Sequence, residues 1–199
     1  GGGIPLRTER LLPFPIDAVV EDSVSLLDVA WDGRSRFVRD SGAPFAHMVM
    51  RERFDALLLD HAQRAGAEFR PGTTVRSLGR DGRVRVRAEG FEAEAERLVC
   101  ADGAHSPVGK LAGLGRGLAE CAAWEVEVQA PAAQLGAYRS TALIDLGYDP
   151  WGYAWVFPKR SVLSIGIVLT PGQADTMKDR VAAYLDRHGS FSDAHTACP

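Results

Sequence analysis

Two stretches of the chain combine residue types and spacings that could do chemistry. In VCADGAHSP (99–107) an apolar run leads into Asp102 and Gly103, and Ser106 precedes a short apolar segment at 108–112. A strand, a loop of small residues and a helix in this order suit ligand phosphates, because the loop offers free backbone N–H groups beside a helix N-terminus. Asp102 could accept a hydrogen bond from a ribose. A plain Asp-Gly turn with Ser106 capping the helix explains the same residues, so both interpretations stay open.

The second stretch, DPWGYAWVFPK (149–159), carries aromatic side chains at alternate positions. Trp151, Tyr153, Trp155 and Phe157 would all point to one face of an extended strand. Such a strand builds either the core of a sheet or the wall of a large apolar pocket. Aromatic alternation is also ordinary strand propensity, so the pattern alone leaves both alternatives open.

Helices that would position these stretches follow from the periodicity of apolar residues. The clearest spans 51–66, with apolar residues at three- and four-residue steps and Gly66 as its end. Arg51 and Arg53 lie in its first turn, where the helix dipole disfavours cations, so they are either solvated or contact a bound anion. Further helices are predicted at 8–12, 108–112 and 173–188.

Alternating segments predict the strands. We expect a β-hairpin at 24–38 with its turn at Asp32 and Gly33, a three-stranded antiparallel meander at 73–95, and a buried strand at 97–101. Segments at 122–128, 140–146, 154–157 and 161–169 are expected to form one further antiparallel sheet. The predicted fold class is therefore α+β.

Composition narrows the class of protein. The net charge of −3, without a basic stripe, argues against nucleic-acid binding, and the apolar runs fall far short of a membrane span. Cys100, Cys121 and Cys198 are odd in number and widely spaced, which argues against disulfides and a zinc site and predicts a reducing, cytoplasmic setting. The His residues show no metal-ligand spacing, so no metal site is expected. Without a signal peptide or an initiator Met, the chain is expected to be an internal fragment.

Two of these segments resemble the FAD-dependent hydroxylase and reductase superfamily. VCADGAHSPVGKLAG (99–113) resembles its second flavin-binding motif, and MRERFDALLLDHAQRAGAEF (50–69) is similar to the helix after its first Arg contact. The resemblance implies that Arg51 contacts the ribose-pyrophosphate region of FAD. It also implies that Asp102, Gly103 and the loop to Ser106 lie along the phosphate and ribityl portion of the cofactor, with NAD(P)H as the expected reductant.

The aromatic stretch resembles one family more closely. Its order Pro-x-x-Tyr-x-Trp-x-Phe, followed by Pro-Lys and a strand ending at Gly166, resembles the geranylgeranyl reductase family. Gly1 to Gly3 are similar to the end of that family's Cys-Gly-Gly-Gly segment. The resemblance implies an FAD-dependent oxidoreductase that reduces C=C bonds of a geranylgeranyl or other polyprenyl group. Contact with a membrane surface is compatible with such substrates. No catalytic acid is assigned, and the implied substrate contacts are Gly2, Gly3, Pro150, Tyr153, Trp155 and Phe157.

Two sequence segments typical of this family are missing, and their absence determines the domain organisation that we expect. A GxGxxG after a first strand is absent, since 113–118 gives only GxGxG after a helix, and the late Gly-Asp-Ala segment is also missing. We therefore expect part of a glutathione-reductase-like FAD-binding domain at 1–118 and a substrate domain at 119–199, with 14–48 a candidate part of the substrate sheet. The isolated chain is expected to hold FAD weakly or not at all.

Three alternatives remain open from the sequence. Within flavoenzymes, an FAD-dependent aromatic hydroxylase or halogenase shares the Asp-Gly motif at 102–103. From another class, the chain could be a non-catalytic module that binds an apolar ligand. The third is a purely structural remnant that binds neither.

Overall fold

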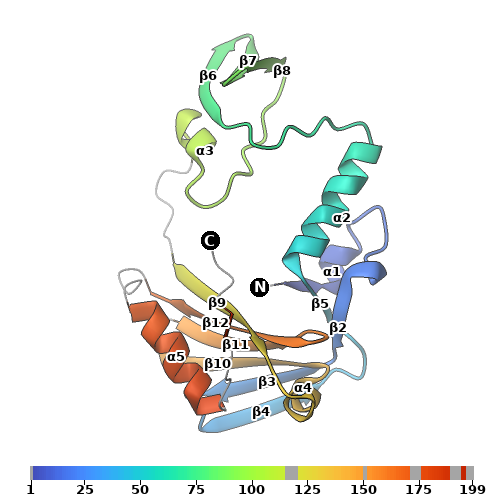
Figure 1. Cartoon of the computed structure of the whole chain (residues 1–199), viewed down its shortest axis with the longest axis vertical. Coiled ribbons are helices and arrows are strands. Elements are labelled where there is room, and N and C mark those ends of the chain that lie inside the picture. The colour runs from blue at the N-terminus through green and yellow to red at the C-terminus, as the bar shows by residue number, and fades with distance from the viewer. Residues whose placement is uncertain (1, 115–120, 150–151, 171–175, 189–193, 196–199) are drawn as a thin grey trace. The chain divides into compact units, whose positions relative to one another are not determined.

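The computed structural model describes residues 2–114, 121–149, 152–170, 176–188 and 194–195 (Figure 1). Its contacts divide into two compact units, Gly1–Ala62 with Cys121–Pro199, and Gln63–Glu120. Each unit is described by itself. The boundary expected near residue 118 separates two functional domains, which these compact units do not test, so it stays a prediction.

A seven-stranded sheet organises the first unit, in the order β13-β9-β12-β11-β10-β3-β4. The four strands predicted between 122 and 169 are confirmed as neighbours, and the predicted hairpin joins them because β3 runs parallel to β10. The hairpin turn has positive φ at Asp32 (51°) and Gly33 (66°), which suits a tight two-strand connection. The strands are β3 (Leu26–Trp31), β4 (Ser35–Asp40), β9 (Ala122–Gln129), β10 (Thr141–Asp149), β11 (Gly152–Pro158), β12 (Val162–Leu169) and β13 (Ala194–His195).

One face of this sheet is covered and forms the main core. The predicted helix is confirmed as α5 (Met177–His188), whose Met177, Val181 and Tyr184 are buried against the sheet. Ala154 and Val156 of β11 belong to the same core. A second helix, α4 (Ala132–Tyr138), packs partly buried residues on this core and was not predicted, because a segment of about two turns is too short to show a periodic stripe.

A smaller three-stranded sheet, β1-β5-β2, lies in the same unit. The predicted helix at 51–66 is confirmed as α2 (Arg51–Arg64), and Gly66 follows it with φ +96°. Phe54 is buried on the small sheet, Leu57 and Leu58 pack partly buried against the same cluster, and the His61 ring stacks on Phe14. The apolar stripe is therefore covered from the first turn of α2 to His61. The remaining elements are β1 (Gly3–Pro5), α1 (Leu6–Glu9, against 8–12 expected), the 3-10 turn Asp17–Val19, β2 (Val20–Val24) and β5 (Ala46–Val49).

The second unit contains the predicted meander and one short helix. The strands β6 (Val75–Asp81), β7 (Arg83–Ala88) and β8 (Phe91–Ala95) pair antiparallel, and α3 (Pro107–Leu111) follows. The buried strand predicted at 97–101 is wrong: these residues form no strand, and Val99 is 84% exposed. A strand is stable only beside a neighbour with an open edge. Within the described residues no strand pairs with this segment.

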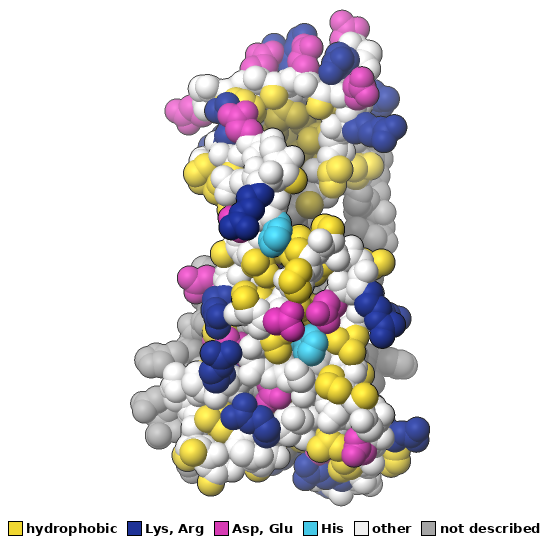
Figure 2. All heavy atoms as spheres, turned by 90° about the vertical axis from the view of Figure 1, so that its right-hand side faces the viewer, with side chains coloured by type: hydrophobic (Ala, Val, Ile, Leu, Met, Phe, Trp, Pro, Cys, Tyr) yellow, Lys and Arg dark blue, Asp and Glu magenta, His cyan; other side chains and the backbone are white. Residues whose placement is uncertain are grey.

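Charged groups of both signs are intermixed on the surface. In the view of Figure 2, Lys and Arg side chains alternate with Asp and Glu over the visible face, and hydrophobic side chains lie between them. None of the described helices is both long enough and apolar enough to span a membrane.

Candidate functional site

The aromatic side chains of β11 share one face of the large sheet, as the alternation predicts. The ring centroids of Tyr153 and Trp155 are 5.9 Å apart with planes at 49°, and those of Trp155 and Phe157 are 6.2 Å apart at 33°. Pro150 and Trp151 lie outside the described residues. The opposite face of β11 belongs to the main core. On the aromatic face Phe157 packs against a smaller buried cluster that includes Met48, and Trp155 is 6% exposed, whereas Tyr153 is 39% exposed. The aromatic row is therefore packed at its Phe157 end and open at Tyr153.

This aromatic face continues across neighbouring strands towards the β4 edge of the sheet. Tyr153 pairs with Leu146 of β10, which in turn pairs with Trp31 of β3. Trp31 and Phe37 are 62% and 61% exposed. A shallow groove of about 230 Å³ lies here, lined by Val29, Ala30, Trp31, Ser35, Arg36, Phe37 and Leu146. A surface of this composition can hold an extended apolar molecule.

The N-terminal glycines lie beside the other end of the aromatic row. The Gly2 carbonyl accepts a 2.8 Å hydrogen bond from the Val49 N–H, and Gly2 has φ +119°. A Cβ on Gly3 would lie 4.0 Å from Cε2 of Phe157. The structure therefore brings together Gly2, Gly3 and Phe157, which were assigned to one site from separate parts of the sequence.

A buried ion pair borders the same end of the aromatic row. Lys159 is 2% exposed and its Nζ pairs with the carboxylate of Glu127 on β9. A Cβ on Gly2 would lie 3.6 Å from Cε of Lys159. The sequence showed Lys159 only as the end of the aromatic stretch, because its pairing with Glu127 depends on the register of three strands.

The loop after 99–101 is held by its own side chains. The Asp102 carboxylate accepts hydrogen bonds from the Ser106 hydroxyl and from the Val108 N–H at 2.9 Å. The Ser106 Oγ accepts from the Gly109 N–H at 2.8 Å, so Ser106 caps α3. A Cβ on Gly109 would lie 2.5 Å from Ser106 Oγ, which makes Gly109 a residue of this loop that the sequence analysis did not single out.

The same bonds decide what the loop offers to a ligand. They favour the charged carboxylate, so the hydrogen bond from Ser106 and then that from Val108 lower the pKa of Asp102. Gly103 has φ +89°, and a Cβ there would meet nothing within 4 Å. The structure therefore confirms that Ser106 caps α3. The open backbone at Gly103 is the part of the loop that a ligand can approach.

Replacing Ser106 with alanine is expected to raise the pKa of Asp102 towards its ordinary value of 3.8, because the largest cause of the lowering is removed. A lowered folded-state pKa means that these bonds stabilise the loop above that ordinary value and that the stabilisation is lost as pH falls through the folded-state pKa. Carboxyl-detected NMR titration of Asp102 measures the shift. Ser106→Thr, which keeps the hydroxyl, is the control, and equal pKa values in wild type and Ser106→Ala would contradict the assignment.

The two arginines of the first turn of α2 have different partners. Arg51 is 64% exposed and pairs with Asp55 one turn along at 3.0 Å, so it is accessible to an anion. Arg53 pairs with Glu21 and donates to the Ala18 carbonyl at 2.9 Å, so protein groups satisfy it. Arg51 belongs to the first unit and the Asp102 loop to the second.

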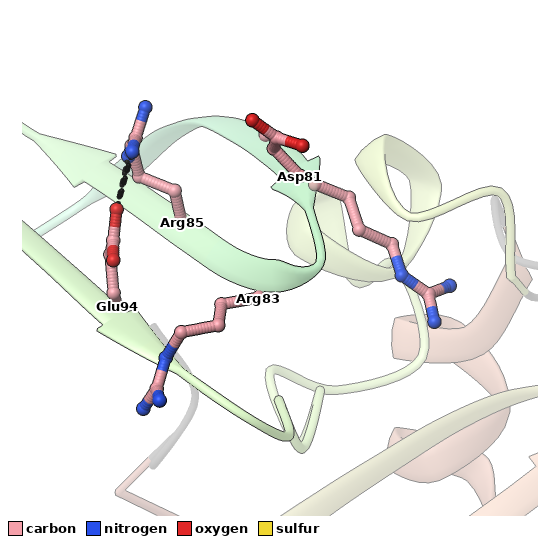
Figure 3. Close-up of a pocket in the computed structure, with 6 residues that line it drawn as sticks. Asp81, Arg83, Arg85 and Glu94 are labelled. Carbon is pink, nitrogen blue, oxygen red and sulfur yellow. Dashed lines mark hydrogen bonds and ion pairs between the residues drawn. The ribbon is translucent and has the colours of Figure 1, made fainter.

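A polar pocket on the meander is a weaker candidate. It measures about 210 Å³ and is lined by Gly79, Arg80, Asp81, Arg83, Arg85 and Glu94. Figure 3 shows Arg85 paired with Glu94, whereas Asp81 and Arg83 point elsewhere. The hydrogen bond that Arg85 donates to Glu94 raises the pKa of Arg85, as expected for a cation already neutralised by its neighbour. Across the described residues, no cluster of His, Cys, Asp and Glu could hold a metal ion.

Comparisons with known proteins agree on a flavoprotein. A family model described as an FAD binding domain matches residues 17–149, more than half of the chain. The digeranylgeranylglycerophospholipid reductase of Methanosarcina acetivorans is 28% identical over 157 residues, which cover 73% of this chain and 38% of that protein. The geranylgeranyl diphosphate reductase of Rhodobacter capsulatus is 31% identical over 176 residues, covering 84% and 44%. The chain therefore spans less than half the length of either relative.

Solved structures share the fold. A geranylgeranyl bacteriochlorophyll reductase-like protein from Thermoplasma acidophilum matches with a TM-score of 0.78 at 17% identity, over 100% of this chain and 54% of that one. The halogenase PltM in complex with phloroglucinol and FAD matches with a TM-score of 0.69 at 18% identity, over 90% and 43%. At these identities the likeness concerns the fold alone.

Proposed function

Since the chain belongs to the family of FAD binding domains, we propose that it is part of an FAD-dependent oxidoreductase that reduces C=C bonds of a geranylgeranyl or other polyprenyl group. NAD(P)H is the proposed reductant of the flavin, and the cytoplasm, with contact to a membrane surface that carries the substrate, is the proposed location. The curated relatives named as reductases of geranylgeranyl compounds support this choice.

The observation that carries the proposal is the aromatic face of the large sheet. Tyr153, Trp155 and Phe157 line it, Gly3 lies beside Phe157, and the exposed groove at Trp31 and Phe37 extends it. A polyprenyl chain is long, apolar and without hydrogen-bonding groups. Such a chain gains most from an extended apolar wall that excludes water along its whole length.

Two separate groups of residues are proposed to contact an anionic dinucleotide. The exposed Arg51 guanidinium would contact its ribose-pyrophosphate, and the open backbone of Gly103, in the loop that Asp102 and Ser106 shape, would lie along its phosphate and ribityl portion. When bound and reduced, FAD supplies the hydride. The contribution of this chain is to hold the polyprenyl chain in a dry, fixed position for that transfer. No residue is assigned as the proton donor.

The proposal is tested on the complete protein. Purified protein is expected to show a bound-flavin absorbance spectrum, and anaerobically reduced flavin is expected to be reoxidised when a geranylgeranyl substrate gains hydrogen. Mass spectrometry of the lipid product provides the second readout. Flavin that is reoxidised only by oxygen would instead indicate an aromatic hydroxylase or halogenase. Prenyl binding without any flavin would indicate a binding module, and binding of neither a structural remnant.

A further inference from the structure

Three residues on neighbouring strands form one row across the aromatic face. Trp155 of β11 pairs with Gly166 of β12, and Gly166 pairs with Glu125 of β9. The indole N–H of Trp155 donates a 3.0 Å hydrogen bond to Oε2 of Glu125. The indole therefore crosses the whole of β12 and is bound to a strand that is not its neighbour in the sheet.

Gly166 is the position that the indole crosses. A Cβ on Gly166 would lie 2.5 Å from Cη2 of Trp155 and closer still to Cζ2, so no side chain fits beneath the ring. The φ angle of Gly166 lies outside the left-handed region, so its backbone conformation does not require glycine. By contrast, Gly147 lies under Trp31 but also has φ +80°. At position 166 the ring alone explains the glycine.

The hydrogen bond to Glu125 fixes the ring in this flat position. Trp155 is only 6% exposed, and a buried indole N–H needs an acceptor. A carboxylate accepts a stronger hydrogen bond than a neutral group does. The space left at Gly166 and the acceptor at Glu125 together hold the ring in this one orientation.

We propose that Glu125 is a positioning residue and Gly166 a specificity-determining residue of the polyprenyl site. Held flat, the indole lies between Tyr153 and Phe157 and does not extend into the proposed path of the substrate. A lifted indole would occupy the path of the chain. This inference rests on the proposed function for its substrate, while the orientation of the ring is tested without any ligand.

The orientation test follows the indole N–H resonances of the ¹⁵N-labelled chain. Trp155→Phe assigns the resonance of Trp155, which is expected to exchange slowly with solvent. Glu125→Ala is expected to speed this exchange at least about tenfold, because the acceptor is lost. Glu125→Gln keeps an acceptor oxygen and is expected to retain the protection. Fast exchange in the wild type, or equal exchange in wild type and Glu125→Ala, would overturn the positioning role.

The specificity test uses prenyl reduction by the complete protein. Gly166→Ala is expected to raise KM for a geranylgeranyl substrate about tenfold, with kcat nearly unchanged. This is the effect expected when one extra methyl group disturbs an apolar binding site. Gly136→Ala is the matched control, since a Cβ on Gly136 of α4 meets nothing within 4 Å. Trp155→Phe/Gly166→Ala, whose smaller ring leaves room for the methyl group, is expected to show the KM of Trp155→Phe alone.

The outcomes separate this inference from the function on which it rests. An unchanged KM in a folded Gly166→Ala protein overturns the specificity role, as does a Gly166→Ala protein that fails to fold while the double variant folds and shows a KM above that of Trp155→Phe alone. A wild type that binds flavin but reduces no prenyl substrate overturns the proposed function and the specificity role with it. The exchange experiment then still decides the orientation of Trp155.

Discussion

Replacing Arg36 with alanine is expected to lower the free energy of unfolding by about 3 kcal/mol. Asp28 is 1% exposed on the covered face of the large sheet, and the Arg36 Nε donates to its two oxygens at 2.8 and 2.7 Å. Without Arg36 the buried carboxylate has lost its charged partner. Because the side chain of Arg36 is itself 62% exposed, water enters readily once it is removed, which places the loss at the lower end of the range for broken buried pairs.

Urea denaturation followed by tryptophan fluorescence measures this loss. Arg34→Ala is the matched control from the same hairpin, since Arg34 is 85% exposed and pairs with Asp32 at 3.5 Å. An exposed pair contributes about 0.5 kcal/mol, so the control is expected to change little. Adding Asp28→Asn to Arg36→Ala removes the buried charge and is expected to restore part of the stability. Equal losses for Arg34→Ala and Arg36→Ala would show that burial of Asp28 does not decide the effect.

The sequence predicted the elements whose residues interact mainly within the segment. The helix at 177–188 and the strands of the meander follow from local periodicity, and the structure contains them. β2 and β5 were missed because VEDSV and AHMV have no strong alternation. Contacts far along the chain make them strands: the Ser23 hydroxyl lies 2.9 Å from Nδ1 of His47, and Val24 and Met48 are buried in a shared cluster. The segment 97–101 shows the opposite case. Its local pattern predicts a strand, but no strand among the described residues pairs with it.

In the candidate site, too, the sequence predicted what depends on one strand and missed what depends on the pairing of strands. Side-chain parity on one strand is visible in the sequence, so the shared face of Tyr153, Trp155 and Phe157 was predictable. The register between strands is not visible. Glu125 therefore appeared as an ordinary charged residue, and Gly166 only as the end of the strand after the aromatic stretch, although the row across the sheet gives both a specific partner in Trp155. Cofactor and substrate roles for the predicted residues remain predictions that the variants above address.

Replacing Gly2 with alanine is expected to cost about 2–3 kcal/mol of stability, whereas the same change at Gly3 is expected to cost little. A Cβ on Gly2 would lie closer than 3.0 Å to the Val49 carbonyl oxygen, a backbone atom that cannot turn away, at a φ of +119° that L side chains rarely adopt. A Cβ on Gly3 meets Sδ and Cε of Met48 at 3.6 Å, an ordinary contact with a flexible side chain. Thermal unfolding monitored by circular dichroism measures both.

The pair of variants separates the structural role of these glycines from the proposed substrate contact. In Gly2→Ala the β1 to β5 pairing is disturbed, so stability and prenyl reduction by the complete protein are expected to fall together. In Gly3→Ala the fold is kept, but the new methyl group lies near Phe157, where the polyprenyl chain is proposed to pass. Its KM for a geranylgeranyl substrate is therefore expected to rise about tenfold at unchanged stability. A Gly3→Ala protein with the KM of the wild type would remove Gly3 from the substrate site and leave both glycines a role in the fold alone.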